Sequence, residues 1–582
     1  MTRVRVILFE RGGLISIVAL ALYIWVAPAH IGGGDNAEFA TLGTLGGVAH
    51  PSGYPLYLLW LRAMTWLPAE NPAHATAIAT AILGAAQLVV LHAACRAWGA
   101  HALAATVAVA IFAASPLVLQ FYTEAEVFAL NGLVAATVLW LAADNGPLRG
   151  TWKAVALGLI AGLGLANHST CVLLAPIGLF GAVRAIREAT LPRPAVVILA
   201  ILALAAGFVP YVYLLVTSEP QLAWTHIDDL GGLVHHFLRL DYGSGRLTSQ
   251  DIPVPYGKQL LALLGSLTTG WLWLPLAVGL TSLVGFCARA TAGARLQWCA
   301  LTASLLLAGP LLLTRFNLEP EGTGLFICQR FHILPTLLLV IPVAVGLDRL
   351  AARFARGRAI RLGVGTIIAI FGFAAIAGRS LPHLMRAQSP AIENALRGTL
   401  RSLPRDAVMI VSPDSLYFGT GYLQDVLGER RDVVLIGWPM MKSPEYRERL
   451  KRRLGFSLPD GDGALTSVEV AEEVFAHGRA LVIDAFGGNI ARAFPTYPYG
   501  LVFRVLSRDT PPPPLREQYE QNKALFDTFD LEYPWPGDDD EPAAMIHVQY
   551  ARTWMLLAQG LLAAGDRERA ELAQQRAIQL AP

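Results

Sequence analysis

Residues 195–217 read AVVILAILALAAGFVPYVYLLVT, a run without a single Asp, Glu, Lys or Arg. A helix needs about 20 mostly apolar residues to cross the hydrocarbon core of a bilayer. This run is long enough to do so alone. It decides the fold class, because a chain that carries several such runs is predicted to be an α-helical polytopic membrane protein.

Comparable runs recur up to about residue 380, and about eleven spans are expected. Their predicted ranges are 13–29, 73–96, 102–119, 127–143, 153–166, 170–183, 195–217, 259–286, 297–314, 331–347 and 362–378. The shorter stretch 55–67 is expected to form a helix lying along the membrane interface. The chain is 54% hydrophobic and only 15% charged, whereas soluble domains carry about 25% charged residues.

The charges and the cysteines exclude other classes. The formal net charge is +2, and there is no basic face rich in aromatic residues, so no nucleic-acid partner is expected. The five cysteines contain no CxxC pair, and most lie in or at the ends of apolar segments, so neither a disulfide framework nor a zinc site is expected. They are Cys95, Cys171, Cys287, Cys299 and Cys328.

Lys and Arg residues gather in alternate loops, and loops rich in these residues face the cytoplasm. With the N-terminus inside, the outside loops between His30 and Tyr57 and between Gln120 and Leu130 hold no Lys or Arg. The part after residue 380 then also lies outside. The inside loops hold Arg149, Lys153, Arg184, Arg187, Arg193, Arg289, Arg295, Arg349, Arg353, Arg356, Arg358 and Arg361.

The first apolar segment has two interpretations. Arg3, Arg5 and Arg11 precede a run that ends in Ala27-Pro28-Ala29, which resembles a signal-peptidase site. Because many spans follow, we expect the segment to remain as an anchor.

A soluble α/β domain is expected over residues 390–510, after a membrane domain over residues 1–380. Apolar runs at 408–411, 433–436 and 480–483 have the length and composition of buried strands. Helical stretches lie between them, near 443–454 and 467–477. Strands that alternate with helices indicate a small α/β domain.

The last part of the chain is predicted to be a linker followed by a helical hairpin. Prolines at 511–514 and a Pro/Asp-rich stretch at 534–542 indicate a linker over residues 511–543. Residues 544–582 resemble one tetratricopeptide repeat, with an ordinary helical hairpin as the alternative. The residues at the repeat's spacing are Trp554, Leu557, Ala558, Gly565, Ala570, Ala577 and Pro582.

The first outside loop is the strongest candidate for chemistry. It reads GGGDNAEF over residues 32–39 and continues as HPSGYP over residues 50–55. Ionisable groups beside a membrane core are costly, which favours a functional role for Asp35 and Glu38. The alternative is that Asp35 caps a helix with Glu38 as its capping-box partner. His50 on its own is more typical of a structural hydrogen bond than of a ligand.

Other polar residues lie on the same side of the membrane. Glu124 and Glu126 stand in the second outside loop, where a solvated helix start would explain them equally well. Asn167 and His168 end a short span, where a turn is the simpler interpretation. Arg330 enters a span, where it could be an interfacial anchor or an anion clamp. The sequence shows no P-loop, dinucleotide motif, HExxH or Ser-His-Asp arrangement.

The first-loop motif resembles the signature of a large bacterial membrane family. The animal relatives of this family are protein O-mannosyltransferases of the endoplasmic reticulum. The residues that carry the resemblance are Gly33 to Phe39, Ala49 to Leu56, Glu124 to Asn131, Gly164 to His168, Trp224 to Gly243, Gln329 to Phe331 and Tyr422 to Gly428. Two positions depart from the pattern: Ser52 stands where a second proline is usual, and Ala37 where glycine is expected.

The resemblance implies the GT-C architecture, with a catalytic carboxylate in the first outside loop and a polyprenyl-phosphate sugar as donor. Asp35 is then the catalytic residue and Glu38 supports it. Arg330 or Arg239 would stabilise the departing phosphate. The expected substrate-binding residues are His50, Tyr54, Glu124, Glu126, Asn167, His168, His236, Arg239 and Arg330. No metal ligand is assigned, and metal dependence stays open.

The sequence thus predicts an inverting glycosyltransferase of a bacterial inner membrane. It would move mannose or another hexose to a hydroxyl of a periplasmic acceptor, a protein Ser or Thr or an envelope glycan. The partners expected are the bilayer, the lipid-linked sugar, the acceptor and a protein bound by the terminal hairpin. The alternatives are a transporter or flippase of a lipid-linked saccharide, which would show internal repeats, and a non-catalytic envelope assembly factor.

Overall fold

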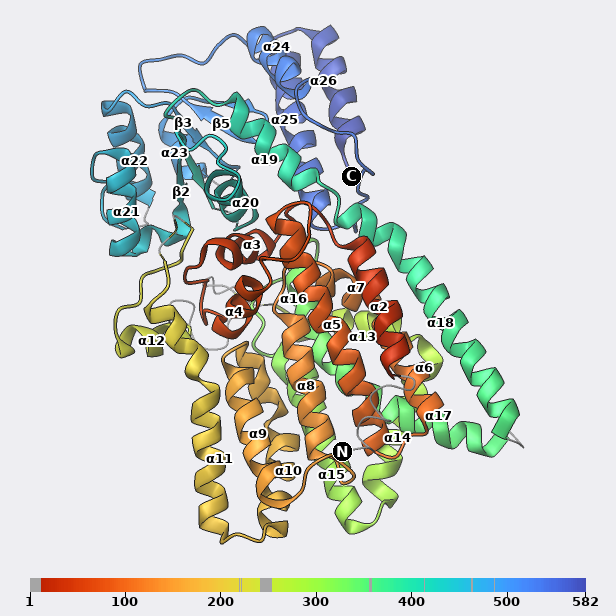
Figure 1. Ribbon diagram of the computed structural model, residues 1–582. Helices are drawn as coiled ribbons and strands as arrows, with labels where there is room; N and C mark the ends of the chain where they lie inside the picture. The colour runs from red at the N-terminus through yellow and green to blue at the C-terminus, as the bar shows by residue number, and fades with distance from the viewer. Residues whose placement is uncertain are drawn as a thin grey trace.

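The computed structural model in Figure 1 describes residues 12–218, 220, 222–240, 247, 254–354, 358–412, 414–461, 464–485 and 487–582. A bundle of helices forms one part, and a smaller α/β part with a helical hairpin is stacked on one end of it. Arg3, Arg5, Arg11, Arg356 and the end of the family-like stretch at 241–243 lie outside the described residues.

The bundle contains the apolar segments. Its helices are α2 (Gly12–Val26), α5 (Pro72–Ala97), α6 (Ala102–Ala113), α7 (Pro116–Tyr122), α8 (Phe128–Ala142), α9 (Gly150–Leu165), η1 (Ser169–Leu174), α10 (Ala175–Glu188), α11 (Arg193–Gly207), η2 (Val209–Leu215), α13 (Tyr256–Trp271), α14 (Trp273–Arg289), α15 (Ala292–Leu306), η3 (Leu307–Leu311), α16 (Thr323–Leu338), α17 (Val340–Phe354) and α18 (Arg358–Ala387). Among the described residues, four helical segments are long and apolar enough to cross a membrane, or six if each bent pair is one span. The count of eleven spans stays a prediction.

Two predicted spans are bent. The range expected as one helix at 259–286 breaks at Leu272 into α13 and α14, which meet at 109°. Pro275 explains the break, because its ring would clash with the carbonyl of Trp271 in a continuous helix. The range 102–119 bends by 65° between α6 and α7, where Pro116 starts the new helix.

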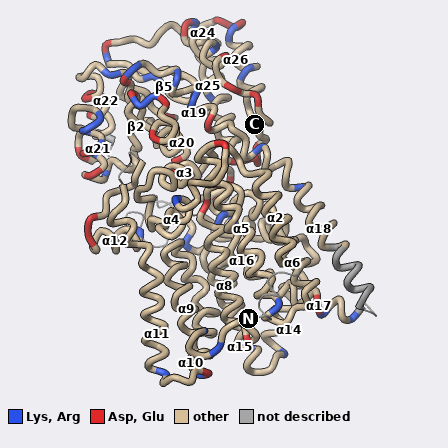
Figure 2. The backbone as a smooth tube through the Cα atoms, in the orientation of Figure 1, with Lys and Arg blue, Asp and Glu red and all other residues tan. Residues whose placement is uncertain are grey.

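Three short helices lie between the bundle and the α/β part. They are α3 (Asn36–Leu45), α4 (Pro55–Ala63) and α12 (Leu230–Phe237). The predicted short helix at 55–67 is therefore present as α4, while its position along a membrane surface stays a prediction. Figure 2 shows few charged residues along the middle of the bundle and many over the α/β part.

The α/β part is built on a five-stranded sheet in the order β2-β1-β3-β5-β4. Its elements are α19 (Ala391–Ser402), β1 (Val408–Val411), α20 (Asp414–Asp425), β2 (Val434–Gly437), η4 (Trp438–Lys442), α21 (Pro444–Leu454), α22 (Ala464–Ala476), β3 (Leu481–Ile483), α23 (Gly488–Ala493), β4 (Thr496–Tyr499) and β5 (Val502–Val505). Strands β1, β2 and β3 run parallel and match the three predicted strands. The antiparallel hairpin of β4 and β5 was not predicted.

The stretch predicted as a linker is largely structured. Residues 515–526 form helix α24 (Leu515–Phe526), because its apolar face is buried: Leu525 and Phe526 are in the same hydrophobic core as Trp554. Asp540 forms ion pairs with His383 and Arg386 of α18. The chain ends in the hairpin of α25 (Ala543–Ala563) and α26 (Arg567–Leu580), whose assignment as a tetratricopeptide repeat stays a prediction.

Candidate functional site

The first outside loop is clamped between the two parts of the molecule. The backbone N–H of Ile31 donates to Glu393 at 2.9 Å, and that of Gly34 donates to the Ser415 hydroxyl at 3.1 Å. A β-carbon at Gly33 would lie 2.4 Å from the Cβ of Pro542, so only glycine allows this approach. The glycines of the loop therefore serve contacts with the protein itself.

Asp35 stands at the N-terminus of α3 but does not cap it with its side chain. Its Oδ2 instead accepts a hydrogen bond from Nη1 of Arg330 at 2.5 Å and lies 3.9 Å from Nε2 of His50. The side chain keeps 18% of its surface exposed. The capping-box interpretation is therefore wrong, and the carboxylate faces a charged, accessible environment.

Glu38, one turn further along α3, orients His50. One carboxylate oxygen accepts from the His50 backbone N–H at 2.8 Å, and the other lies 2.6 Å from Nδ1 of the ring. The other ring nitrogen, Nε2, lies 2.8 Å from the hydroxyl of Tyr54. Glu38 is fully buried, so this row of hydrogen bonds fixes the imidazole beside Asp35.

The electrostatics separate the roles of these groups. Burial opposes the ionised form of Asp35, but the positive charges of Arg330 and His50 outweigh it and hold the pKa of Asp35 below its usual value. Burial also opposes the charged form of His50, yet Glu38 and Asp35 raise its pKa to about 8. Burial raises the pKa of Glu38 against the pull of His50. At neutral pH the pair nearest the accessible space is therefore an ionised Asp35 and a protonated His50.

Arg330 joins the second outside loop to the first. The same Nη1 atom that binds Asp35 also donates to Oε1 of Glu126 at 2.9 Å. Glu124 and Glu126 are buried to 2% and 1% exposure. Burial raises the pKa of Glu126 to about 7, and burial together with Glu126 raises that of Glu124 well above its usual value. The alternative of a solvated helix start does not hold, because solvent does not reach either carboxyl group, and their role in substrate binding stays a prediction.

The remaining predicted residues surround this centre. The Asn167 amide donates to the carbonyl of Val127 at 3.3 Å, and the ring of His168 stacks on Tyr54 at 5.6 Å. His236 holds the carbonyl of Ala49 at 2.9 Å. Arg239 lies close enough for its charge to lower the pKa of Asp35, after the larger effects of burial, Arg330 and His50. These residues thus support the site from its flanks.

Three residues of the centre could hold a metal ion. Ligand atoms of Asp35, Glu38 and His50 all lie within 4.8 Å of one another, and carboxylates with an imidazole are suitable ligands for a divalent cation. No metal ligand was assigned from the sequence. In this structure the positive charge beside Asp35 is the guanidinium of Arg330, which donates a hydrogen bond to the Asp35 carboxylate.

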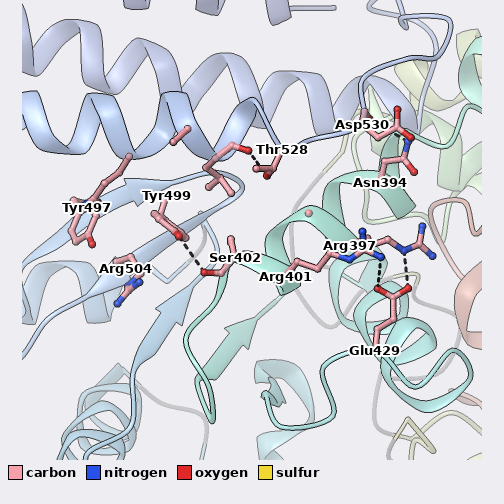
Figure 3. A pocket seen from close by; sticks show the side chains of 14 residues that line it. Asn394, Arg397, Arg401, Ser402, Glu429, Tyr497, Tyr499, Arg504, Thr528 and Asp530 are labelled. Carbon is pink, nitrogen blue, oxygen red and sulfur yellow. Dashed lines mark hydrogen bonds and ion pairs between the residues drawn. The ribbon is translucent and has the colours of Figure 1, made fainter.

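Two of the larger cavities found among the described residues lie outside this centre. One, of about 510 Å³, is lined by α7, α13, α16 and α18 and includes Gln329 and Arg379. The other, of about 1190 Å³, lies in the α/β part between α19, the β4–β5 hairpin and α24. Figure 3 shows its two tyrosines, Tyr497 and Tyr499, near Arg504, and Arg397 and Arg401 near Glu429.

The sequence missed the contribution of the α/β part. Ser415 contacts the loop at Gly34 although 381 residues separate them. Its neighbour Asp414 lies within electrostatic reach of Asp35 and His50. The similarity that begins at Tyr422 marked the same helix, but nothing in the local sequence indicates that its first turn faces the membrane domain.

The match to a known family begins at the central carboxylate. Residues 35–190 match the model of the Protein O-mannosyl-transferase TMEM260 N-terminal domain. The mouse Protein O-mannosyl-transferase TMEM260 is 28% identical over 454 residues, which is 75% of this chain and 63% of the mouse protein. The Dictyostelium discoideum protein of the same description is 22% identical over 41% of this chain and 31% of its own length. The resemblance predicted from the first-loop motif is confirmed.

The fold has a solved counterpart. The structure of ArnT from Cupriavidus metallidurans bound to undecaprenyl phosphate has a TM-score of 0.52 and 12% identity, covering 86% of this chain and 99% of ArnT. The same protein in the apo state has a TM-score of 0.51. At this identity the likeness concerns the fold alone, and it agrees with the predicted helical membrane architecture. The chain spans less than two thirds of the mouse TMEM260 protein.

Proposed function

We propose that this chain is a membrane glycosyltransferase that moves mannose or another hexose from a polyprenyl-phosphate donor to a hydroxyl of a protein Ser or Thr. One observation carries the proposal: Asp35, the first residue of the TMEM260 match, is held ionised beside Arg330 and His50 in an accessible position. The similarity to the mouse O-mannosyl-transferase supports the reaction and the sugar. The undecaprenyl phosphate bound to ArnT, which shares the fold, suggests the class of lipid.

In the proposed reaction, Asp35 accepts the proton of the acceptor hydroxyl as its oxygen attacks the anomeric carbon. The bond between that carbon and the phosphate oxygen breaks, and the polyprenyl phosphate leaves with the electron pair. Attack opposite to the leaving group inverts the configuration. Glu38 is hydrogen-bonded to His50, and His50 to Tyr54, so the imidazole beside Asp35 is held in one orientation.

Arg330 is the proposed cation for the donor phosphate. Its Nε atom is buried without a hydrogen-bond partner among the described residues, and its Nη1 atom is shared by Asp35 and Glu126. A phosphate that binds this guanidinium would weaken the ion pair between Arg330 and Asp35. The affinity of the Asp35 carboxylate for a proton would then rise. The cavity beside Gln329 and Arg379 is the proposed space for part of the lipid.

The proposed location is a bacterial inner membrane, with the N-terminus in the cytoplasm and the α/β part in the periplasm. Cysteines placed singly at exposed positions near residues 350 and 460 would be labelled with an impermeant reagent in intact cells. Labelling near 460 with protection near 350 is expected, and the reverse pattern would refute this orientation. The acceptor, and a protein partner at the terminal hairpin, would then meet the chain outside.

The activity is tested with the purified full-length chain, a polyprenyl-phosphate mannose and a Ser/Thr peptide. A gain of one hexose mass on the peptide is the expected result, and it should vanish in the Asp35→Asn variant. A lipid-linked sugar that crosses vesicle membranes without any gain on the peptide would favour the flippase instead.

A further inference from the structure

A carboxylate of the α/β part stands next to the residue that contacts the first outside loop. Asp414 is the first residue of α20, and the hydroxyl of the next residue, Ser415, accepts the Gly34 N–H at 3.1 Å. Gly34 directly precedes Asp35. We propose that the carboxylate of Asp414 binds the acceptor polypeptide, and this inference rests on the function proposed above.

The position of Asp414 is fixed by contacts at both ends of its helix. The hydroxyl of Tyr422, two turns further along α20, accepts the backbone N–H of Ala73 at 3.2 Å, so the helix is tied to the membrane domain there as well. Before the helix, the Ser412 N–H donates to the carboxylate of Asp484. Asp414 therefore stands on a rigid element.

The side chain of Asp414 is available for a ligand. It is exposed, and among the described residues it has no hydrogen-bond or ion-pair partner. Despite this exposed surface, its dense surroundings and the charge of Asp35 raise its pKa to about 6, while His50 acts in the opposite direction. The carboxylate is thus largely ionised at neutral pH and lies near the candidate catalytic groups.

The charge of Asp414 indicates which substrate it binds. A carboxylate repels the donor phosphate, whose proposed cation, Arg330, lies in the membrane domain. Backbone N–H and hydroxyl groups of a polypeptide donate hydrogen bonds to carboxylates. Asp414 belongs to the α/β part, and its neighbour Ser415 contacts Gly34, the residue before Asp35, where the acceptor hydroxyl is expected to attack.

The test is a steady-state comparison of full-length wild-type protein with Asp414→Asn, using a polyprenyl-phosphate mannose and a Ser/Thr peptide. A lost charge-assisted hydrogen bond should raise the KM for the peptide by about tenfold or more. The kcat and the KM for the donor should change less than about twofold. The matched control is Asp406→Asn, another exposed aspartate near the opposite end of β1, which should leave all three constants unchanged.

Direct binding of the peptide keeps the inference testable without turnover. The affinity of wild-type protein and Asp414→Asn for a fluorescent Ser/Thr peptide would be measured, with the thermal midpoint as a check on folding. Equal affinity overturns the inference, as does an effect of Asp414→Asn on the donor KM alone. If wild-type protein binds the peptide more tightly than Asp414→Asn but transfers no sugar to it, the proposed function is refuted and the proposed acceptor site is kept.

Discussion

The first and second outside loops each carry two carboxylates, and only Asp35 of the first loop is partly exposed, while Glu38 is as buried as both carboxylates of the second loop. Asp35 and Glu38 stand beside His50, with Asp35 partly exposed. Glu124 and Glu126 are sealed from solvent, and the Oε1 atom of Glu124 has no hydrogen-bond partner among the described residues. Composition alone therefore does not assign a role to an acidic loop.

The pKa values of these carboxyl groups differ because different positive charges lie near them. Arg330 and His50 overcome the effect of burial on Asp35 and lower its pKa, whereas burial dominates at Glu124 and raises its pKa. Groups whose surroundings push their pKa values apart can take different roles in one site. The first loop can hold an ionised catalytic group, and the second loop supplies the buried partner of Arg330.

The largest expected effect is that of Asp35→Asn. The variant keeps the size of the side chain but removes the negative charge, so transfer to a peptide should fall by roughly 10²–10⁴-fold if Asp35 is the general base. The loss in thermal midpoint should be small beside the loss in rate, because asparagine keeps an oxygen that accepts from Arg330 and Glu126 still pairs with that guanidinium. Near-normal turnover would direct the search to Glu126.

Arg330→Lys should have the next largest effect. Lysine keeps the charge but loses the planar fork that can meet Asp35, Glu126 and a phosphate together. Donor affinity should fall by about tenfold to a hundredfold, measured with a labelled polyprenyl phosphate in detergent. If Arg330→Ala binds the donor as wild-type protein does, the residue only ties the two loops together.

Glu38→Gln should shift the pH dependence of transfer. The negative charge of Glu38 helps to raise the pKa of His50 to about 8. His50 keeps its proton up to that pH in the wild type, so its stabilising ion pair is complete below the ordinary value and is lost as the pH rises through about 8. Without Glu38 the alkaline decline in rate and in thermal midpoint should begin at lower pH. An unchanged profile would contradict this coupling.

Glu124→Gln should have the smallest effect. Burial and Glu126 raise the pKa of Glu124 well above its usual value, which favours the neutral form of this carboxyl group. Glutamine reproduces the shape and charge of that neutral form, and both turnover and stability should stay within about twofold and about 1 kcal/mol of wild type. A large loss of turnover would mean that the second loop also needs an ionised carboxylate, which would remove the contrast between the loops.

The elements marked by a local pattern of apolar residues were predicted from the sequence, and the contacts between residues far apart in the chain were missed. The three parallel strands were found because each is a short apolar run, whereas β4 contains Pro498 and buries only Tyr497 of its four residues. The residues Asp35, Glu38, His50 and Arg330 were expected together only through the resemblance. The bond between Ser415 and Gly34 has no local signal, since the fold alone brings these residues together.

Pro542 packs against Gly33, and Glu541 lies 3.3 Å from the hydroxyl of Thr323 at the start of α16. The loop near the beginning of the chain is therefore completed by residues near its end. During synthesis this loop leaves the ribosome some five hundred residues before its partner does. Until residues near Pro542 have been made and have folded against it, Gly33 stays uncovered, so in a nascent or truncated chain Asp35 would stand in an incomplete site.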